Sequence, residues 1–104
     1  MSKDKVVKEA IKMCGRAHAP FSNYKVGSAV EVKSGEIIGG CNIESSSYGL
    51  TCCAERVALF RAIAEGYSQF KSIAVATKIQ EWLVEHADKS YRNFIVKHRY
   101  IYVI

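Results

Sequence analysis

The sequence lacks the features that would mark a membrane, secreted or fibrous protein. Only one of its 104 residues is proline, and no apolar run is long enough to cross a bilayer. The first ten residues, MSKDKVVKEA, are charged where a secretory signal would be apolar. Because a chain of this length buries only one small core, these absences predict a single soluble, cytoplasmic domain.

Positive charge exceeds negative charge, but it does not form the pattern of a nucleic-acid interface. Lys and Arg number 15 against 10 Asp and Glu, and much of the excess lies near the C-terminus, around KHRY. A groove that follows a nucleic-acid backbone interleaves basic and aromatic residues, and that pattern is missing. We therefore expect no nucleic acid and no membrane as partner, and keep nucleic-acid binding by the basic tail only as an alternative.

The chain has four cysteines, Cys14, Cys41, Cys52 and Cys53, and none follows residue 53. Without a secretory signal these four thiols are not expected to form disulfides. In a reducing compartment such thiols are more often small buried hydrophobic groups or metal ligands.

The spacing of apolar residues predicts an α/β fold. Residues 3–19 carry apolar side chains three and four positions apart, which is typical of an amphipathic helix that Pro20 ends. Residues 25–44 are rich in β-branched and small residues around Lys33-Ser34-Gly35, which predicts a hairpin. Residues 70–77, FKSIAVAT, are typical of a buried strand.

A second helix is predicted after a polar loop at residues 45–50. Thr51 can cap this helix, which then runs to about Glu65 and stops at Gly66. Its expected buried side consists of Ala54, Val57, Ala58 and Ala62. The resulting order of strands and helices predicts a sheet covered by helices.

The stretch CNIESSSYGLTCCAER, residues 41–56, contains the residues with the most chemistry. Cys53 falls in the first turn of the predicted helix, where unpaired N–H groups and the dipole stabilise a thiolate that can bind zinc. Glu55 projects about 200° around the helix from Cys53, so it is expected to flank a metal-bound water rather than to bind the metal. Cys52 is expected to point about 100° away, into the core.

The residues alone leave a second interpretation open. A buried thiol followed by a first-turn acid explains Cys53 and Glu55 without any metal. In the same way, Asn42 and Glu44 of CNIE can simply end a strand and begin a turn.

The run HAPFSNYKVGSAVEVKSGEIIGGCNIESSSYGLTCCAERVALFRAIAEG closely resembles the small, homotetrameric, zinc-dependent cytidine deaminases. The motifs APFSxYxVG, GCNIE and CAER carry the resemblance, which extends from the first helix to about Thr77. It implies a three-layer α/β/α sandwich with a mixed sheet whose C-terminal part is incomplete. It also implies deamination of cytidine or deoxycytidine to the uridine nucleoside, in pyrimidine salvage.

The resemblance assigns catalytic roles to the CAER motif. Cys53 takes the place of a zinc ligand and Glu55 that of the catalytic proton shuttle. Arg56 resembles the residue that donates hydrogen bonds to zinc-bound sulfurs.

It also assigns contacts to the nucleoside substrate. Asn42 and Glu44 would hold the ribose hydroxyls, and a site built in this way rejects ligands that lack them. Tyr24 would pack against the nucleoside, and the backbone of Ala54 would contact the base.

The chain departs from the family pattern after about Thr77. The family's other two thiolates come from a Pro-Cys-Gly-x-Cys-Arg motif, but here the region reads KIQEWLVEHADKSYRNF and has no cysteine. A catalytic zinc needs three protein ligands. The remaining candidate ligands are Glu85, His86, Asp88 and His98, and also Cys41 and Cys52.

One hypothesis explains the divergent tail at residues 78–104. The possible codons for residues 85–90 can be regrouped so that the third base of each codon is joined to the first two bases of the next codon. The new triplets permit the sequence Ala-Cys-Arg-Gln-Val. The tail would then be an out-of-frame translation after the deaminase-like part, residues 1–77, and would pair as an edge strand or stay disordered. The alternative to an active enzyme is therefore a catalytically inactive nucleoside-binding protein, or an oligomer partner, of the same fold.

Overall fold

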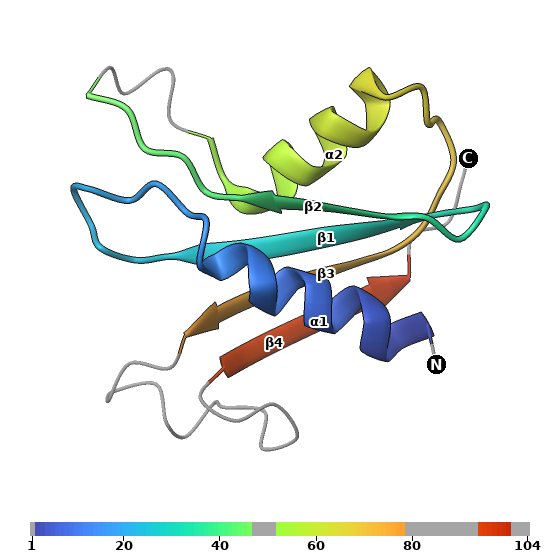
Figure 1. The fold of residues 1–104 in the computed structure, drawn as a ribbon, viewed down its shortest axis with the longest axis horizontal. Coiled ribbons are helices and arrows are strands. Elements are labelled where there is room, and N and C mark those ends of the chain that lie inside the picture. Colours follow the sequence, from blue (N-terminus) through green and yellow to red (C-terminus); the bar gives the residue numbers. More distant parts are fainter. Residues whose placement is uncertain (1, 47–51, 79–93, 101–104) are drawn as a thin grey trace.

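One four-stranded sheet and two helices make up the described fold (Figure 1). The structure is a computed structural model that describes residues 2–46, 52–78 and 94–100. The elements are α1 (Ser2–Cys14), β1 (Val26–Val32), β2 (Ile37–Cys41), α2 (Ala54–Ala64), β3 (Phe70–Lys78) and β4 (Phe94–Tyr100). No helix among these residues is long and apolar enough to span a membrane.

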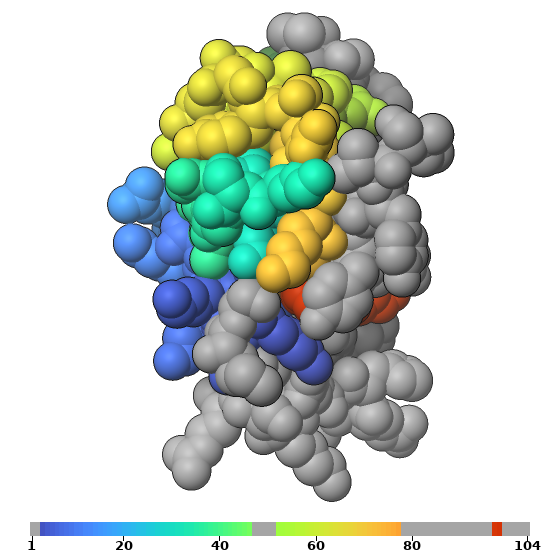
Figure 2. Space-filling view, turned by 90° about the vertical axis from the view of Figure 1, so that its right-hand side faces the viewer, coloured from blue at the N-terminus to red at the C-terminus, as the bar shows by residue number. Residues whose placement is uncertain are grey.

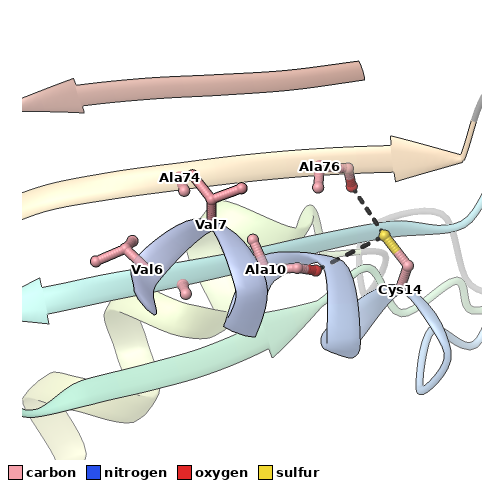
Figure 3. Close-up of a cluster of buried hydrophobic side chains, with 7 residues drawn as sticks. Val6, Val7, Ala10, Cys14, Ala74 and Ala76 are labelled. Atoms are coloured by element: carbon pink, nitrogen blue, oxygen red, sulfur yellow. Dashed lines mark hydrogen bonds between the residues drawn. The ribbon is translucent and has the colours of Figure 1, made fainter. Parts of the chain in front are cut away.

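The two helices cover opposite faces of the sheet and create two separate cores. On one face α1 buries Val6, Val7, Ala10 and Cys14 against small residues of β1 and β3 (Figure 3). On the other face α2 buries Ala58 and Ala62 against Val30, Val32 and Ile38. Because neighbouring residues of a strand face opposite sides, β1 contributes to both cores and is buried almost throughout. The α/β class and the three layers are confirmed.

The sheet has the order β2-β1-β3-β4, and every pair of neighbours among these strands is antiparallel. The mixed sheet that the family resemblance implies is therefore not found among the described strands. β2 and β3 do run in the same direction, because both are antiparallel to β1, but β1 lies between them.

The first helix ends five residues before the predicted boundary at residue 19. Beyond Cys14, three successive N–H groups bond carbonyls three residues back, which tightens the chain into turns. The backbone of His18 then pairs with residues 42 and 44. The prediction that the helix continues to residue 19 was wrong. The pairing of His18 uses backbone groups that a longer helix would need, and hydrophobic periodicity does not indicate such pairing.

The predicted hairpin and the predicted strand at residues 70–77 are confirmed. β1 and β2 pair from Gly27 with Cys41 to Glu31 with Ile37. Gly35 stands in the turn with φ of 105°, a conformation that glycine adopts at little cost. The strand following α2 extends one residue further, to Lys78.

Helix α2 ends as predicted but begins later. Gly66 has φ of 100°, and Tyr67 N–H bonds Ala62 C=O as in a Schellman ending. The N-cap is Cys53 rather than Thr51, which lies outside the described residues. The start differs because Cys52 is held in an extended bridge to Ile43, so the chain cannot become helical before Cys53. Val57 is only half-buried, unlike Ala54, Ala58 and Ala62.

Part of the predicted tail forms a strand. β4 pairs with β3 from Lys78 with Phe94 to Ser72 with Tyr100, at one edge of the sheet. Residues 79–93, which include Glu85, His86 and Asp88, lie outside the described residues, as do residues 101–104.

Candidate functional site

Three segments distant in sequence meet beside the start of β1. The backbone of Ile43 lies between His18 and Cys52: Glu44 N–H donates to His18 C=O at 2.8 Å, and Cys52 N–H donates to Ile43 C=O at 2.8 Å. These short bridges bring the CNIE segment next to the beginning of the CAER helix. Because backbone hydrogen bonds make the junction, it does not depend on the side chain of Ile43, which is 42% exposed.

A cleft of about 350 Å³ opens at this junction. Its lining includes seven residues that the sequence singled out and one, Val26, that it did not: Val26, Asn42, Glu44, Cys52, Cys53, Ala54, Glu55 and Arg56. A second hollow of about 360 Å³ lies at the other end of β1, between the hairpin turn and the end of α2. Figure 2 shows these two segments next to each other. The second hollow gathers none of the motif residues, so the first cleft is the candidate site.

Asn42 uses its amide group to fix the edge of the cleft. Its Oδ1 accepts from Val26 N–H at 2.9 Å, and its Nδ2 donates to Tyr24 C=O at 2.8 Å. An amide has a second N–H and a second lone pair, so one donor and one acceptor remain for a ligand. The side chain is half-buried and preorganised by both bonds.

Glu44 anchors the loop that precedes β1. Its Oε1 accepts from the N–H groups of Phe21 and Ser22, at 3.0 and 3.1 Å, and its Oε2 accepts from the hydroxyl of Ser22. These bonds favour the ionised carboxylate, so they lower the pKa of Glu44, with the Ser22 hydroxyl as the largest cause. Glu44 therefore stands at the cleft as a fixed anion.

This shift predicts that Glu44 contributes to acid sensitivity. Because its pKa is lowered from 4.5 by folding, its contribution to stability is present above about pH 4.5 and is lost as the pH falls through the native pKa. We expect Glu44→Gln to remove this contribution. The measurement is the free energy of unfolding of both chains between pH 6 and pH 3. A difference between the two that stays constant over this range contradicts the prediction.

Cys53, Glu55 and Arg56 stand where the cleft meets α2. Cys53 is the N-cap residue, with φ of −76° and ψ of 159°, and its side chain is exposed. The prediction that it occupies the first turn was wrong by one position, because the helix starts at Ala54. Glu55 and Arg56 are exposed in the first turn, and Ala54 is buried beneath them.

Cys52 was wrongly predicted to point into the core. It is half-buried and lines the cleft next to Cys53. The prediction failed because it assumed helical geometry, in which neighbours diverge by about 100°, whereas Cys52 is extended and bridges Ile43.

The other two cysteines are part of the core and do not line the cleft. Cys14 Sγ lies 3.1 Å from Ala76 C=O, and Cys41 Sγ lies 3.4 Å from Arg16 C=O (Figure 3 shows Cys14). Burial is the main cause that raises the pKa of both thiols. They therefore behave as small buried residues and not as ligands at the cleft.

The described residues do not complete a zinc site. A catalytic zinc requires three protein ligands, and no three His, Cys, Asp or Glu side chains gather as a ligand set in residues 2–46, 52–78 and 94–100. Cys53 and its neighbour Cys52 are the thiols at the cleft. This donor set therefore does not fit a complete zinc centre.

Tyr24, to which the family resemblance assigns a contact with the nucleoside, does not line the cleft. It is half-buried, and its carbonyl is held by Asn42. Sequence reasoning in turn missed Val26 and the anchoring serine, Ser22. The signal for Ser22 was its place in the APFS motif, next to residues that were assigned to the substrate.

Comparison with protein families gives an independent view of the chain. The family model described as "Cytidine and deoxycytidylate deaminase zinc-binding region" matches residues 1–89. A cytidine deaminase of Halalkalibacterium halodurans is 48% identical over 75 residues, which are 72% of this chain and 57% of that protein. A probable cytidine deaminase of Dictyostelium discoideum is 48% identical over 65 residues, 62% of this chain and 44% of that protein.

Solved structures show the same similarity. The crystal structure of cytidine deaminase from Burkholderia pseudomallei matches with a TM-score of 0.72 and 43% identity, over 77% of this chain and 65% of that one. The cytidine deaminase from Mycobacterium tuberculosis matches with a TM-score of 0.70 and 30% identity, over 74% and 63% of the two chains. The chain spans about half the length of the curated relatives it matches.

Proposed function

Because the chain belongs to the cytidine and deoxycytidylate deaminase family, we propose that it functions in hydrolytic deamination of cytidine or deoxycytidine. The observation that carries the proposal is that the CNIE and CAER motifs line the same cleft. In the proposed reaction the oxygen of a water molecule replaces the exocyclic amine of the pyrimidine, which yields the uridine nucleoside and ammonia.

The acid that moves the proton in this reaction is proposed to be Glu55. Its carboxylate lines the cleft at the exposed start of α2. A general acid or base must reach both water and the leaving group, so an exposed position in a cleft suits this role. The backbone of Ala54, in the same turn, is proposed to contact the base.

Recognition of the ribose is proposed to rest on Asn42 and Glu44. Asn42 keeps one donor and one acceptor for a ligand, and Glu44 presents a carboxylate whose pKa is lowered by its hydrogen bonds. A site of this kind selects nucleosides over free bases, because its polar groups stay unpaired without the sugar hydroxyls. Tyr24 is proposed to pack against the bound nucleoside from the loop.

Zinc is the proposed cofactor, with Cys53 as the ligand that this chain presents and Arg56 as a hydrogen-bond donor near its sulfur. The family model is that of a zinc-binding region, which supports this proposal. When bound, zinc supplies an activated water. Further ligands have to come from outside the described residues.

We also propose that residues 78–104 are the product of an out-of-frame translation. The test is the sequence of the coding DNA. If no single-base change near codon 77 restores Cys-x-x-Cys-Arg, this proposal is wrong.

The second candidate function is nucleoside binding without catalysis. It is favoured by the absence of any cysteine after Cys53 in the sequence, together with the burial of Cys14 and Cys41. Assembly into an oligomer and action in cytoplasmic pyrimidine salvage are proposed for either function. Support for assembly comes from α2, on which Phe60 is 57% and Ile63 is 53% exposed.

One experiment separates the two functions. The purified chain is incubated with cytidine, with added zinc or with a chelator, and ammonia release, bound zinc and nucleoside affinity are measured. For the enzyme we expect ammonia release that rises with bound zinc and stops with the chelator. For the binding protein we expect saturable cytidine binding that survives the chelator, with no ammonia. A chain that neither binds nor converts cytidine contradicts both functions.

A further inference from the structure

A single hydroxyl group stands between the loop before β1 and the acid at the cleft. Ser22 Oγ donates to Glu44 Oε2 and accepts from Tyr24 N–H at 3.1 Å. Because the Tyr24 N–H occupies the oxygen's acceptor side, the hydroxyl hydrogen is left to point at the carboxylate. The three groups form a chain that leads from the backbone of the loop to Glu44.

This hydroxyl completes the orientation of the carboxylate. Glu44 Oε1 is anchored by two backbone N–H groups, but neither of these bonds holds Oε2. With Ser22 in place, both oxygens are held, and the carboxylate presents its remaining lone pairs in one fixed arrangement. A preorganised acceptor binds a ligand hydroxyl with less loss of entropy than a mobile one.

We propose that Ser22 is a positioning residue for nucleoside recognition, which orients Glu44 so that its carboxylate accepts a hydrogen bond from a ribose hydroxyl. The inference rests on the proposed function, because it assumes that Glu44 faces the sugar. Ser22 does not line the cleft and acts only through Glu44. Its contribution is therefore to the preference for the intact ribose and not to contacts with the base.

The chain contains a matched control for this arrangement. At the hairpin turn the hydroxyl of Ser34 donates to Glu36 Oε2, and this bond is the largest cause that lowers the pKa of the Glu36 carboxyl. Both serines are exposed and both lie next to a carboxylate. Ser34 lies at the end of β1 that is far from the cleft. Removal of its hydroxyl should therefore affect Glu36 and leave nucleoside binding unchanged.

The test compares the affinities of the wild-type chain and its variants for cytidine and for 2′,3′-dideoxycytidine, by calorimetry in the presence of a chelator. The wild-type chain is expected to prefer cytidine. In Ser22→Ala this preference should fall about fivefold, which corresponds to one lost hydrogen bond. Ser22→Thr, which keeps the hydroxyl, and Ser34→Ala should both retain the wild-type preference.

A second readout does not need a ligand. The Ser22→Ala variant should raise the pKa of Glu44 as followed by carboxyl NMR shifts, while Ser34→Ala raises that of Glu36 alone. If Ser22→Ala fails to fold, Ser22→Cys makes the same test, because a thiol is a weak donor.

The possible failures are distinguishable. A Ser22→Ala chain that keeps the full preference for cytidine overturns the role of Ser22 and leaves the proposed function standing. A loss of preference in Ser34→Ala that is as large as the loss in Ser22→Ala also overturns the role of Ser22, because the effect would then not be specific to the cleft. A wild-type chain that binds no cytidine overturns the proposed function, and the role of Ser22 with it.

Discussion

Replacing Gly27 by alanine is expected to lower the free energy of unfolding by about 3 kcal/mol or more, a cost at the upper end of overpacking. A Cβ atom at this position would lie 1.9 Å from Ala10 O and 2.5 Å from Cys14 N. Both are backbone atoms of α1, so neither can move without shifting the helix from the sheet. Urea unfolding followed by circular dichroism measures the change.

Gly39→Ala is the matched control for this substitution. A Cβ there would also meet α1, but at the side chain of Met13, with Cγ at 2.6 Å and Sδ at 2.9 Å. Methionine is unbranched and adapts its rotamer, so we expect a cost below about 1.5 kcal/mol. Equal destabilisation of both variants would contradict the prediction. It would show that Gly27 is not required for the close approach of the α1 backbone to β1.

The second large effect is expected at Glu55. In any preparation that releases ammonia from cytidine, Glu55→Gln should lower kcat by roughly 10² to 10⁴, because the amide cannot carry a proton between water and the leaving group. Binding of cytidine should change little, since the proposed ribose contacts come from Asn42 and Glu44. Ammonia release under saturating cytidine gives kcat, and calorimetry gives the affinity.

Glu65→Gln provides the control on the same helix. Glu65 is the C-cap residue, pairs with Arg61 at 3.2 Å and does not line the cleft. We expect this variant to retain kcat. If Glu55→Gln has the same turnover as the wild-type chain, the assignment of Glu55 as the proton shuttle is refuted. If the variant loses cytidine binding, Glu55 acts in substrate recognition and not in proton transfer.

The strongest local signals in the sequence predicted the elements correctly. Gly35 and Gly66 mark the hairpin turn and the end of α2, because both positions require a positive φ. The alternation of small and β-branched residues predicted β1, β2 and β3. These signals depend on the chain's own stereochemistry, so no distant contact is needed to interpret them.

Three of the errors occur where distant segments meet. The first helix stops at Cys14, α2 begins at Ala54, and Cys52 lines the cleft, because the backbones of His18, Ile43 and Cys52 pair with one another. Hydrogen bonds between backbone groups leave no pattern in side-chain hydrophobicity. Periodicity therefore extended α1 too far and treated Cys52 as helical.

The sequence by itself determined the α/β class and the motifs that identify the family, because turn residues, hydrophobic spacing and the CNIE and CAER motifs are local. Only the tertiary structure decided that these motifs share one cleft, that Asn42 and Glu44 already hold the preceding loop, and that Ser22 orients Glu44. The reason is that a hydrogen bond between residues 22 apart in the chain depends on the path of the folded backbone, and no local pattern encodes that path.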